Sequence, residues 1–144
     1  MPARALSTDT LGAWLVKASG AAPSTREHVR AGFADVQTWC VRPTYRTELV
    51  AAGQPVLLWV SGSERGLPAG IHAHGHAIGP ARDGVMPIVL VPLTEPLLRS
   101  KLVGNPDLAG LEVLRMPAGS NPSYVTPGQL EVLVAMCEEL AGPV

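Results

Sequence analysis

Three histidines alternate with small residues in the run His72-Ala73-His74-Gly75-His76. In an extended strand alternate side chains share one face, so the three imidazoles would point the same way. A His-x-His pair can supply two ligands of a zinc site, which needs a third or fourth ligand. His72 and His76 would stand about 13 Å apart, and His28 and the two cysteines show no spacing that completes a site. A metal-binding protein or small enzyme using this face is therefore one alternative, and a solvent-facing or pocket-edge face of polar rings, with the small residues packing inward, is the other.

Trp39 is the second residue whose type and position suit chemistry. It lies near the end of the apolar run 35–41, before the polar break at Arg42-Pro43, in a sequence with only 4% aromatic residues. An indole serves either as core filler or as a wall on which a planar ligand stacks. Trp59 lies inside its run, whereas a strand-end indole near a loop is better placed for a ligand. Base–aromatic stacking is worth on the order of 1–3 kcal/mol, so Trp39 is the main candidate for a ligand wall.

Sequence motifs of the common enzyme classes are absent. The chain has no Gly-x-Ser-x-Gly elbow, no phosphate-binding loop and no dinucleotide fingerprint. Its carboxylates are scattered, without a pair at a spacing typical of acid–base catalysis. The sequence therefore favours a protein without catalytic residues, cofactor or metal.

Composition and charge restrict the class of protein further. The chain has 144 residues, of which 47% are hydrophobic and 16% charged, which predicts one globular domain spanning 1–144. The net charge of -1 argues against a protein that coats duplex nucleic acid, because such binding needs a basic excess. A small basic patch around one pocket stays compatible with this balance.

The ends and the cysteines of the chain indicate its surroundings. Cys40 and Cys137 are too far apart in the sequence for a disulfide framework or metal finger, which favours reduced thiols in the cytoplasm. The N-terminal segment has no apolar core typical of a signal peptide, and no apolar run reaches bilayer-spanning length. We expect a cytoplasmic protein without a membrane partner, with residues 1–10 as a flexible lead-in.

The apolar patterns predict the elements that must position these residues. Strands are expected at 11–17, 35–41, 56–61, 69–78, 85–91 and 111–116, and helices or helical turns at 24–33, 45–52, 96–103 and 126–140. Thr126, Pro127 and Gln129 form the clearest helix start, with a capping threonine and proline in the first turn. The strands do not alternate regularly with helices. The predicted fold class is α+β, a small mixed β-barrel of five to six strands with helices packed on the outside.

Several segments, taken in order, resemble the EVE domain of the PUA-like group over nearly the whole chain. The chain is also similar, more remotely, to the YTH domain, which reads N6-methyladenine in RNA; Trp39-Cys40 matches a cage tryptophan followed by a small polar residue. Val60 and Pro68 replace aromatics of that second family, so the identity of the base stays open. The segments that carry the EVE resemblance are Trp14-Leu15-Val16-Lys17, Trp39-Cys40-Val41, Tyr45-Arg46, Gly53, Val56–Gly62, Gly70–Gly75 and Asn121–Thr126.

The resemblance implies a non-catalytic module that takes one modified nucleobase of DNA or RNA into an aromatic pocket. Such a pocket repays the few kcal/mol of base flipping through stacking and edge hydrogen bonds. Trp39 would form the stacking wall, the Cys40 backbone and Ser61 would read polar edges, and Tyr45 and Trp14 would line the pocket. Possible phosphate or pocket-edge contacts are Lys17, Arg42, Arg46 and Asn121.

Two further points remain open at this level. Asn121 either hydrogen-bonds across the pocket or forms an Asx turn before Pro122. A module that has lost its ligand and serves only in protein interactions is a third hypothesis, after the base reader and the metal-binding protein or enzyme. We expect an effector protein, if one takes part, to act in trans.

Overall fold

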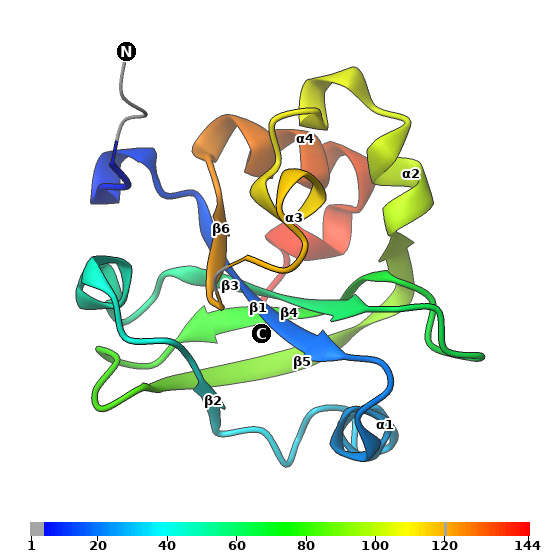
Figure 1. Cartoon of the computed structure of the whole chain (residues 1–144), viewed down its shortest axis with the longest axis horizontal. Coiled ribbons are helices and arrows are strands. Elements are labelled where there is room, and N and C mark those ends of the chain that lie inside the picture. Colours follow the sequence, from blue (N-terminus) through cyan, green and yellow to red (C-terminus); the bar gives the residue numbers. More distant parts are fainter. Residues whose placement is uncertain (1–4, 120) are drawn as a thin grey trace.

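The strands form one curled six-stranded sheet in the order β2-β5-β4-β3-β1-β6 (Figure 1). The computed structural model describes residues 5–119 and 121–144. Neighbouring strands are antiparallel except β1 and β3, which are parallel, so the sheet is mixed. The strands are β1 (Ala13–Ser19), β2 (Thr38–Cys40), β3 (Pro55–Ser61), β4 (Gly70–Ala77), β5 (Val85–Leu98) and β6 (Ser123–Val125).

The longer helices divide between the two sides of the sheet. In Figure 1, α2, α3 and α4 gather on one side, while α1 lies on the other, near β2. This arrangement confirms the predicted α+β class and the small, curled, mixed sheet with helices outside. The helices are α1 (Pro23–Arg30), α2 (Arg99–Val103), α3 (Glu112–Arg115) and α4 (Pro127–Met136), with 3₁₀ turns η1 (Thr8–Thr10), η2 (Tyr45–Leu49), η3 (Pro106–Leu108) and η4 (Glu138–Ala141).

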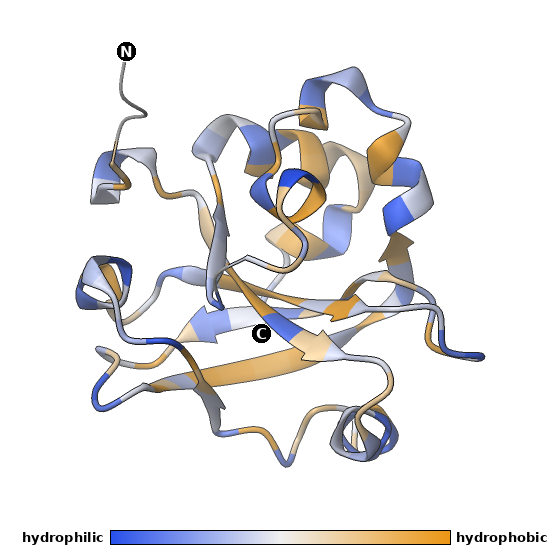
Figure 2. Cartoon of the chain, in the orientation of Figure 1, coloured by the Kyte–Doolittle hydropathy of each residue, from blue (hydrophilic) through white to orange (hydrophobic). Residues whose placement is uncertain are grey.

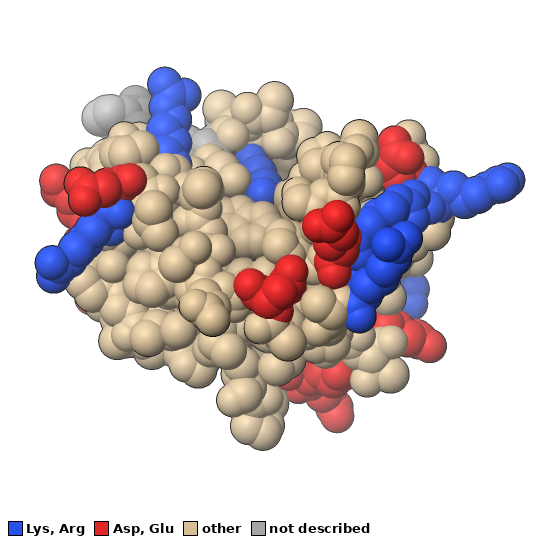
Figure 3. All heavy atoms as spheres, turned by 90° about the horizontal axis from the view of Figure 1, so that it is seen from below, with Lys and Arg blue, Asp and Glu red and all other residues tan. Residues whose placement is uncertain are grey.

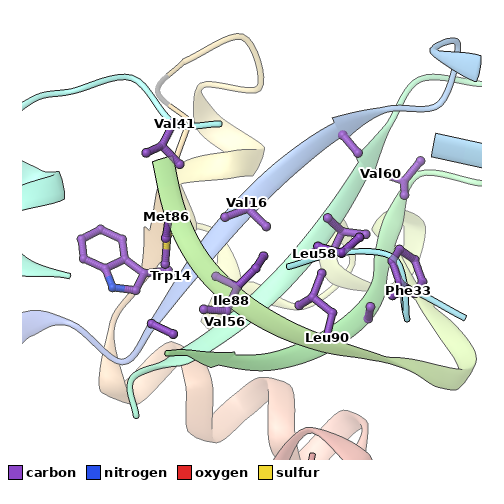
Figure 4. Close-up of a cluster of buried hydrophobic side chains, with 14 of the residues drawn as sticks. Trp14, Val16, Phe33, Val41, Val56, Leu58, Val60, Met86, Ile88 and Leu90 are labelled. Carbon is purple, nitrogen blue, oxygen red and sulfur yellow. The ribbon is translucent and has the colours of Figure 1, made fainter. Parts of the chain in front are cut away.

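Both faces of the central strands are buried, because alternate side chains enter two different cores. Trp14 and Val16 of β1 belong to the core inside the curl, where Trp14 and Phe33 lie at opposite ends in the view of Figure 4. Ala13 and Leu15 belong to the second core, beneath α2, α3 and α4. The central strands are accordingly largely hydrophobic and α1 largely hydrophilic (Figure 2). Burial on both faces explains the near-continuous apolar runs of β1 and β3.

Small residues of β4 face the inner core, as the alternation predicts. Ala73 and Ala77 belong to that core, and a Cβ added to Gly75 would overlap the carbonyl oxygen of Val89 on β5. His72 and His74 are only 7% and 5% exposed, so the solvent-facing form of the expected histidine face is wrong for these two. The pocket-edge form describes His74 and the partly exposed His76, which line a hollow beside α4 and η4.

The capping sequence of the last helix behaves as predicted. The Thr126 hydroxyl accepts the Gln129 N–H at 3.1 Å, and the Gln129 side-chain oxygen accepts the Thr126 N–H at 2.9 Å. Pro127 occupies the first turn, where its missing N–H leaves no bond unmade. The helix ends at Met136, earlier than expected, because Cys137 is extended and a 3₁₀ turn follows.

Four sequence predictions of secondary structure were wrong or incomplete. Residues 111–116 contain the short helix α3, since a few apolar residues within so short a segment fit a helical turn as well as a strand. Residues 96–98 continue β5, so α2 starts only at Arg99. The strand expected at 35–41 is reduced to β2. The edge strand β6 was not predicted.

The expected flexible lead-in is partly folded. Leu6 is buried in the inner core, and its backbone N–H donates to the Tyr45 hydroxyl at 3.1 Å. The 3₁₀ turn η1 follows directly. The prediction is therefore wrong for this part of the segment, while residues 1–4 lie outside the described residues.

Candidate nucleobase cleft

A cleft of about 380 Å³ opens where the end of β1, the start of α1 and the short strand β2 meet. Its size falls in the range of about 300–1,000 Å³ that is typical of small-molecule sites. Four residues predicted for the site meet here: Trp39, Cys40, Lys17 and Asn121. The other lining residues are Ala18, Ser19, Ala22, Ser24, Thr25, His28 and Thr38.

The indole of Trp39 forms one wall of this cleft. The side chain is half-buried, because it packs against the inner core while still lining the cleft. Its Nε1–H donates to the carbonyl oxygen of Lys17 at 3.2 Å. The His28 ring lies 5.8 Å away between centroids, tilted by 54°. These contacts hold the ring in place, so the cleft has a rigid aromatic surface before any ligand arrives.

Asn121, which lies just before β6, extends the hydrogen bonding between β6 and β1. Its side-chain oxygen accepts the Lys17 N–H at 3.1 Å, and its side-chain amide donates to the Lys17 carbonyl at 3.3 Å. Its own carbonyl accepts the Arg42 N–H at 2.7 Å, which joins the loop to the chain after β2. Of the two alternatives for Asn121, the structure therefore favours a long-range bond at the cleft, directed at the backbone of β1.

Lys17 is the one Lys or Arg among the described residues that line the cleft. Its ammonium donates to the carbonyl of Pro117 at 3.3 Å. Burial lowers the pKa of this ammonium; the charge of Glu112 raises it in part, and that of Arg46 lowers it further, so the net direction is downward. The cleft thus has a single, partly desolvated cation at its edge.

Hydroxyl groups and one imidazole complete the cleft, and sequence reasoning did not select them. The Thr25 hydroxyl donates to the Ser19 carbonyl at 2.6 Å, which fastens α1 to the end of β1. The Nδ1 atom of His28 is 2.7 Å from a carboxylate oxygen of Asp35. The signal in the sequence was the short connection between β1 and α1, because it forces the start of the helix to lie beside the strand end.

Three predicted pocket residues lie outside the cleft. Trp14 is fully buried at 0% exposure, and its Nε1–H donates to the Gln54 side chain at 2.7 Å, so it is core and its assignment to the pocket was wrong. Tyr45 is exposed on η2, with its hydroxyl bound to Leu6. The Ser61 hydroxyl donates to the Ala18 carbonyl at 3.3 Å and does not line the cleft.

Arg46 is engaged elsewhere, which corrects its assignment to phosphate. Its guanidinium makes two hydrogen bonds to Glu112, at 2.8 and 2.9 Å, and lies 5.1 Å from the centre of the Tyr124 ring. The Ser123 hydroxyl also donates to Glu112, at 2.8 Å. Burial alone would raise the pKa of Glu112, but the bonds from Arg46 and Ser123 lower it below its ordinary value. This buried pair holds η2, α3 and β6 together.

The remaining predicted cation, Arg42, is exposed beside the cleft. Its backbone is fixed by the bond to Asn121. Its assignment to phosphate contact stays a prediction.

The histidines of β4 do not gather a metal site within the described part of the chain. His72 Nε2 is 2.7 Å from the carbonyl oxygen of Pro68. The register of β4 shifts against both neighbouring strands around His72, which breaks the strict alternation that the sequence suggested. Across residues 5–119 and 121–144, no three His, Cys, Asp or Glu side chains are grouped to hold an ion. The geometry therefore adds no support to the metal-binding alternative.

Charged side chains of both signs are spread over the face seen from below Figure 1. Figure 3 shows Lys and Arg side chains mainly toward the margins of this face, while Asp and Glu side chains lie near its centre as well as at its margins. A strongly basic track for a nucleic-acid backbone is not seen on this face.

No helix among the described residues is long and apolar enough to cross a membrane.

Solved structures share this fold at low sequence identity. A Pseudomonas syringae protein determined by crystallography has a TM-score of 0.66 at 16% identity, covering 85% of this chain and 97% of its own. A hypothetical protein from Leishmania major has a TM-score of 0.71 at 13% identity, with coverages of 94% and 99%. A Rhodopseudomonas palustris protein solved by NMR has a TM-score of 0.63 at 19% identity, with coverages of 88% and 92%. Neither a protein-family model nor a curated protein matches the sequence.

Proposed function

We propose that this protein is a non-catalytic module that binds a modified nucleobase of DNA or RNA in the cleft beside Trp39. The main observation in support is the half-buried indole, which donates a hydrogen bond to the Lys17 carbonyl and lines a cleft of about 380 Å³. A planar base stacked on such a wall gains on the order of 1–3 kcal/mol. Hydroxyls, the Cys40 backbone and Asn121 stand around the same cleft to read the edges of the base.

The resemblance to the EVE domain supports the same function. The remoter similarity to the YTH domain matches Trp39-Cys40 to a cage tryptophan and the small polar residue after it, and the sheet has the small, curled, mixed form that the EVE resemblance implies. The likeness to solved structures supports the fold alone, so the argument for the ligand comes from the cleft and the resemblance.

A flipped or single-stranded base suits the charge of this protein better than an intact duplex. Duplex binders rely on several Lys and Arg contacts to phosphates, each of which makes affinity fall with salt. Here Lys17 lines the cleft, Arg42 lies beside it, and the net charge is -1. We infer a ligand that enters as one exposed base, with few phosphate contacts and weak salt dependence. An effector protein acting in trans, in the cytoplasm, completes the proposal.

A panel of short oligonucleotides tests the proposal. Each probe carries one base in the same flanking sequence, as DNA and as RNA: methylated or hydroxymethylated cytosine, N6-methyladenine or an unmodified base. We expect at least one modified probe to bind more tightly than its unmodified counterpart. Failure of every modified probe to bind the folded protein would refute the proposal.

Trp39→Ala is the matching variant, because it removes the wall while most of the core stays intact. Loss of stacking should weaken the preferred probe by about 5- to 150-fold. Tyr45→Ala is the matched control, since it removes an exposed aromatic ring outside the cleft. Thermal unfolding of both variants shows whether the fold is kept. Equal affinity of the Trp39→Ala variant and the natural protein would contradict the role of the indole.

A further inference from the structure

His28 and Asp35 form a hydrogen-bonded pair at the cleft that the proposed function has not used. His28 Nδ1 lies 2.7 Å from an Asp35 carboxylate oxygen. His28 lines the cleft and its ring is 5.8 Å from that of Trp39. The pair therefore stands beside the wall on which a base would stack.

The carboxylate of Asp35 fixes which nitrogen of the imidazole carries the proton. An ionised carboxylate only accepts hydrogen bonds, so Nδ1 must be the donor. In the neutral imidazole the other nitrogen, Nε2, is then an acceptor. No hydrogen bond from the described residues engages Nε2. Nε2 is therefore the polar atom that His28 can offer to a ligand.

The loop that carries Asp35 is held in a fixed conformation. Gly32 and Phe33 both have left-handed φ angles, of 60° and 61°, and the Phe33 ring is buried in the inner core. A non-glycine residue in this region is strained and persists only where its surroundings enforce it. The Phe33 N–H donates to the His28 carbonyl at 2.8 Å. This tight turn places Asp35 next to His28, seven residues earlier in the sequence.

We propose that His28, oriented by Asp35, selects bases with an amino group at C4 of a pyrimidine or C6 of a purine, as in cytosine and adenine. This inference rests on the proposed function and narrows its ligand class. Adenine and cytosine present an amino donor where guanine, thymine and uracil present a carbonyl oxygen. An amino group can donate to Nε2, whereas a carbonyl oxygen would face another acceptor. A mismatch of that kind leaves two polar groups unpaired in a partly desolvated site, which disfavours the keto base.

Matched pairs of probes change the amino position with little other change in the base. Cytosine and uracil with the same 5-substituent differ at the amino position and at the adjacent ring nitrogen, as do adenine and hypoxanthine. We expect the natural protein to bind the amino member about tenfold more tightly or better. The ratio of the two affinities is the measured quantity, because a general loss of stability would weaken both members alike.

Asp35→Asn is the decisive variant. The amide can donate to Nδ1, which frees the proton to sit on Nε2 and turns that atom into a donor. The amino-to-keto ratio should then fall to about one or invert, and His28→Ala should also bring it to about one. Glu27→Gln is the matched control, since it removes one exposed acidic charge from the same helix without touching the pair. That control should keep the ratio of the natural protein.

Nitrogen-15 NMR of the free protein gives a second readout that needs no ligand. His28 should show the Nδ1–H tautomer in the natural protein and lose that preference in the Asp35→Asn variant. An Nε2–H tautomer in the natural protein overturns the inference. Modified probes that keep the amino-to-keto ratio of the natural protein in both Asp35→Asn and His28→Ala overturn it while leaving the proposed function intact. Absence of binding to every probe overturns both.

Discussion

The indole N–H of Trp39 donates to the backbone carbonyl of Lys17 over 3.2 Å, which ties β2 to β1. The same carbonyl accepts from the Asn121 side chain. One backbone oxygen thus fixes the aromatic wall of the cleft and the loop that borders it. A ligand that stacks on Trp39 meets a surface already ordered, so little conformational entropy is lost at this wall on binding.

Trp39→Phe separates the ring from its hydrogen bond. The phenyl ring still offers a stacking face, but the bond to Lys17 is lost, so the ring is free to reorient. We expect the free energy of unfolding to fall by about 0.5–1.5 kcal/mol. Affinity for the preferred base should fall less than in Trp39→Ala. Urea unfolding and the probe titration measure the two effects, and an equal loss of affinity in both variants would show that the indole N–H matters more than the ring face.

Trp14→Ala should lower the stability of the fold much more than Trp39→Ala does. Trp14 is fully buried at the end of the inner core, so its removal leaves a cavity and strands the Gln54 side chain. Such a change costs about 3–5 kcal/mol of stability. Thermal unfolding should show a much larger decrease for Trp14→Ala than for Trp39→Ala. Similar melting temperatures for the two variants would contradict the division between core and wall.

Asn121→Ala should weaken both the fold and the cleft. It leaves the Lys17 N–H without its partner and removes one of two donors from the Lys17 carbonyl. We expect a loss of about 1–3 kcal/mol in the free energy of unfolding. Asn121→Asp keeps the acceptor and loses the donor, so its effect should be intermediate. Chemical denaturation of the three proteins gives the order, and an alanine variant as stable as the natural protein would rule out this role.

Glu112→Gln should alter the dependence of stability on acid. The folded pKa of Glu112 lies below its ordinary value of 4.5. A lowered folded pKa means that the ionised group stabilises the fold above its unfolded pKa, and that this contribution disappears as pH falls through the folded pKa. Near neutral pH the variant should be less stable by about 3 kcal/mol, because Arg46 loses its buried partner.

The difference between Glu112→Gln and the natural protein should shrink on acidification below pH 4.5. Urea unfolding at a series of pH values measures it. Glu131→Gln, an exposed substitution on α4, serves as the control and should change stability little at any pH. A difference that stays constant with pH would exclude Glu112 as the titrating group.

Gly75→Ala should be strongly destabilising. A Cβ at this position would overlap the backbone of Val89, so β4 and β5 would have to move apart. We expect a loss of about 3 kcal/mol or more. Gly128→Ala is the control, because a Cβ there meets open space within helix α4 and should raise stability by about 0.5–1 kcal/mol. Melting temperatures that shift equally would contradict the steric explanation.

Short sequence segments predicted the features that depend on residues close together in the sequence. The cap at Thr126, the apolar runs of β3 and β4, and the strand-end position of Trp39 all follow from short segments. Trp39 was selected from its strand-end position, whereas Cys40, Lys17 and Asn121 were expected from the family resemblance; all four line one cleft.

Short sequence segments could not predict contacts between residues that are far apart in the sequence. Arg46 and Glu112 are 66 positions apart, and nothing near either residue reveals the other. His28 enters the cleft only because α1 folds back beside β1 and Asp35 returns to it after the left-handed turn. Trp14 was assigned to the pocket from the family resemblance, and because its strand is buried on both faces, alternation could not correct that assignment.

The two edge strands, β2 and β6, are short, which affects whether copies of this protein can pair through their sheets. Each spans only three residues, which offers a neighbouring molecule few unpaired backbone groups to extend the ladder. Long exposed borders invite intermolecular pairing and aggregation, and short ones discourage it. The short edge strands therefore protect this sheet against edge-to-edge polymerisation, even though its interior strands are among the most apolar segments of the chain.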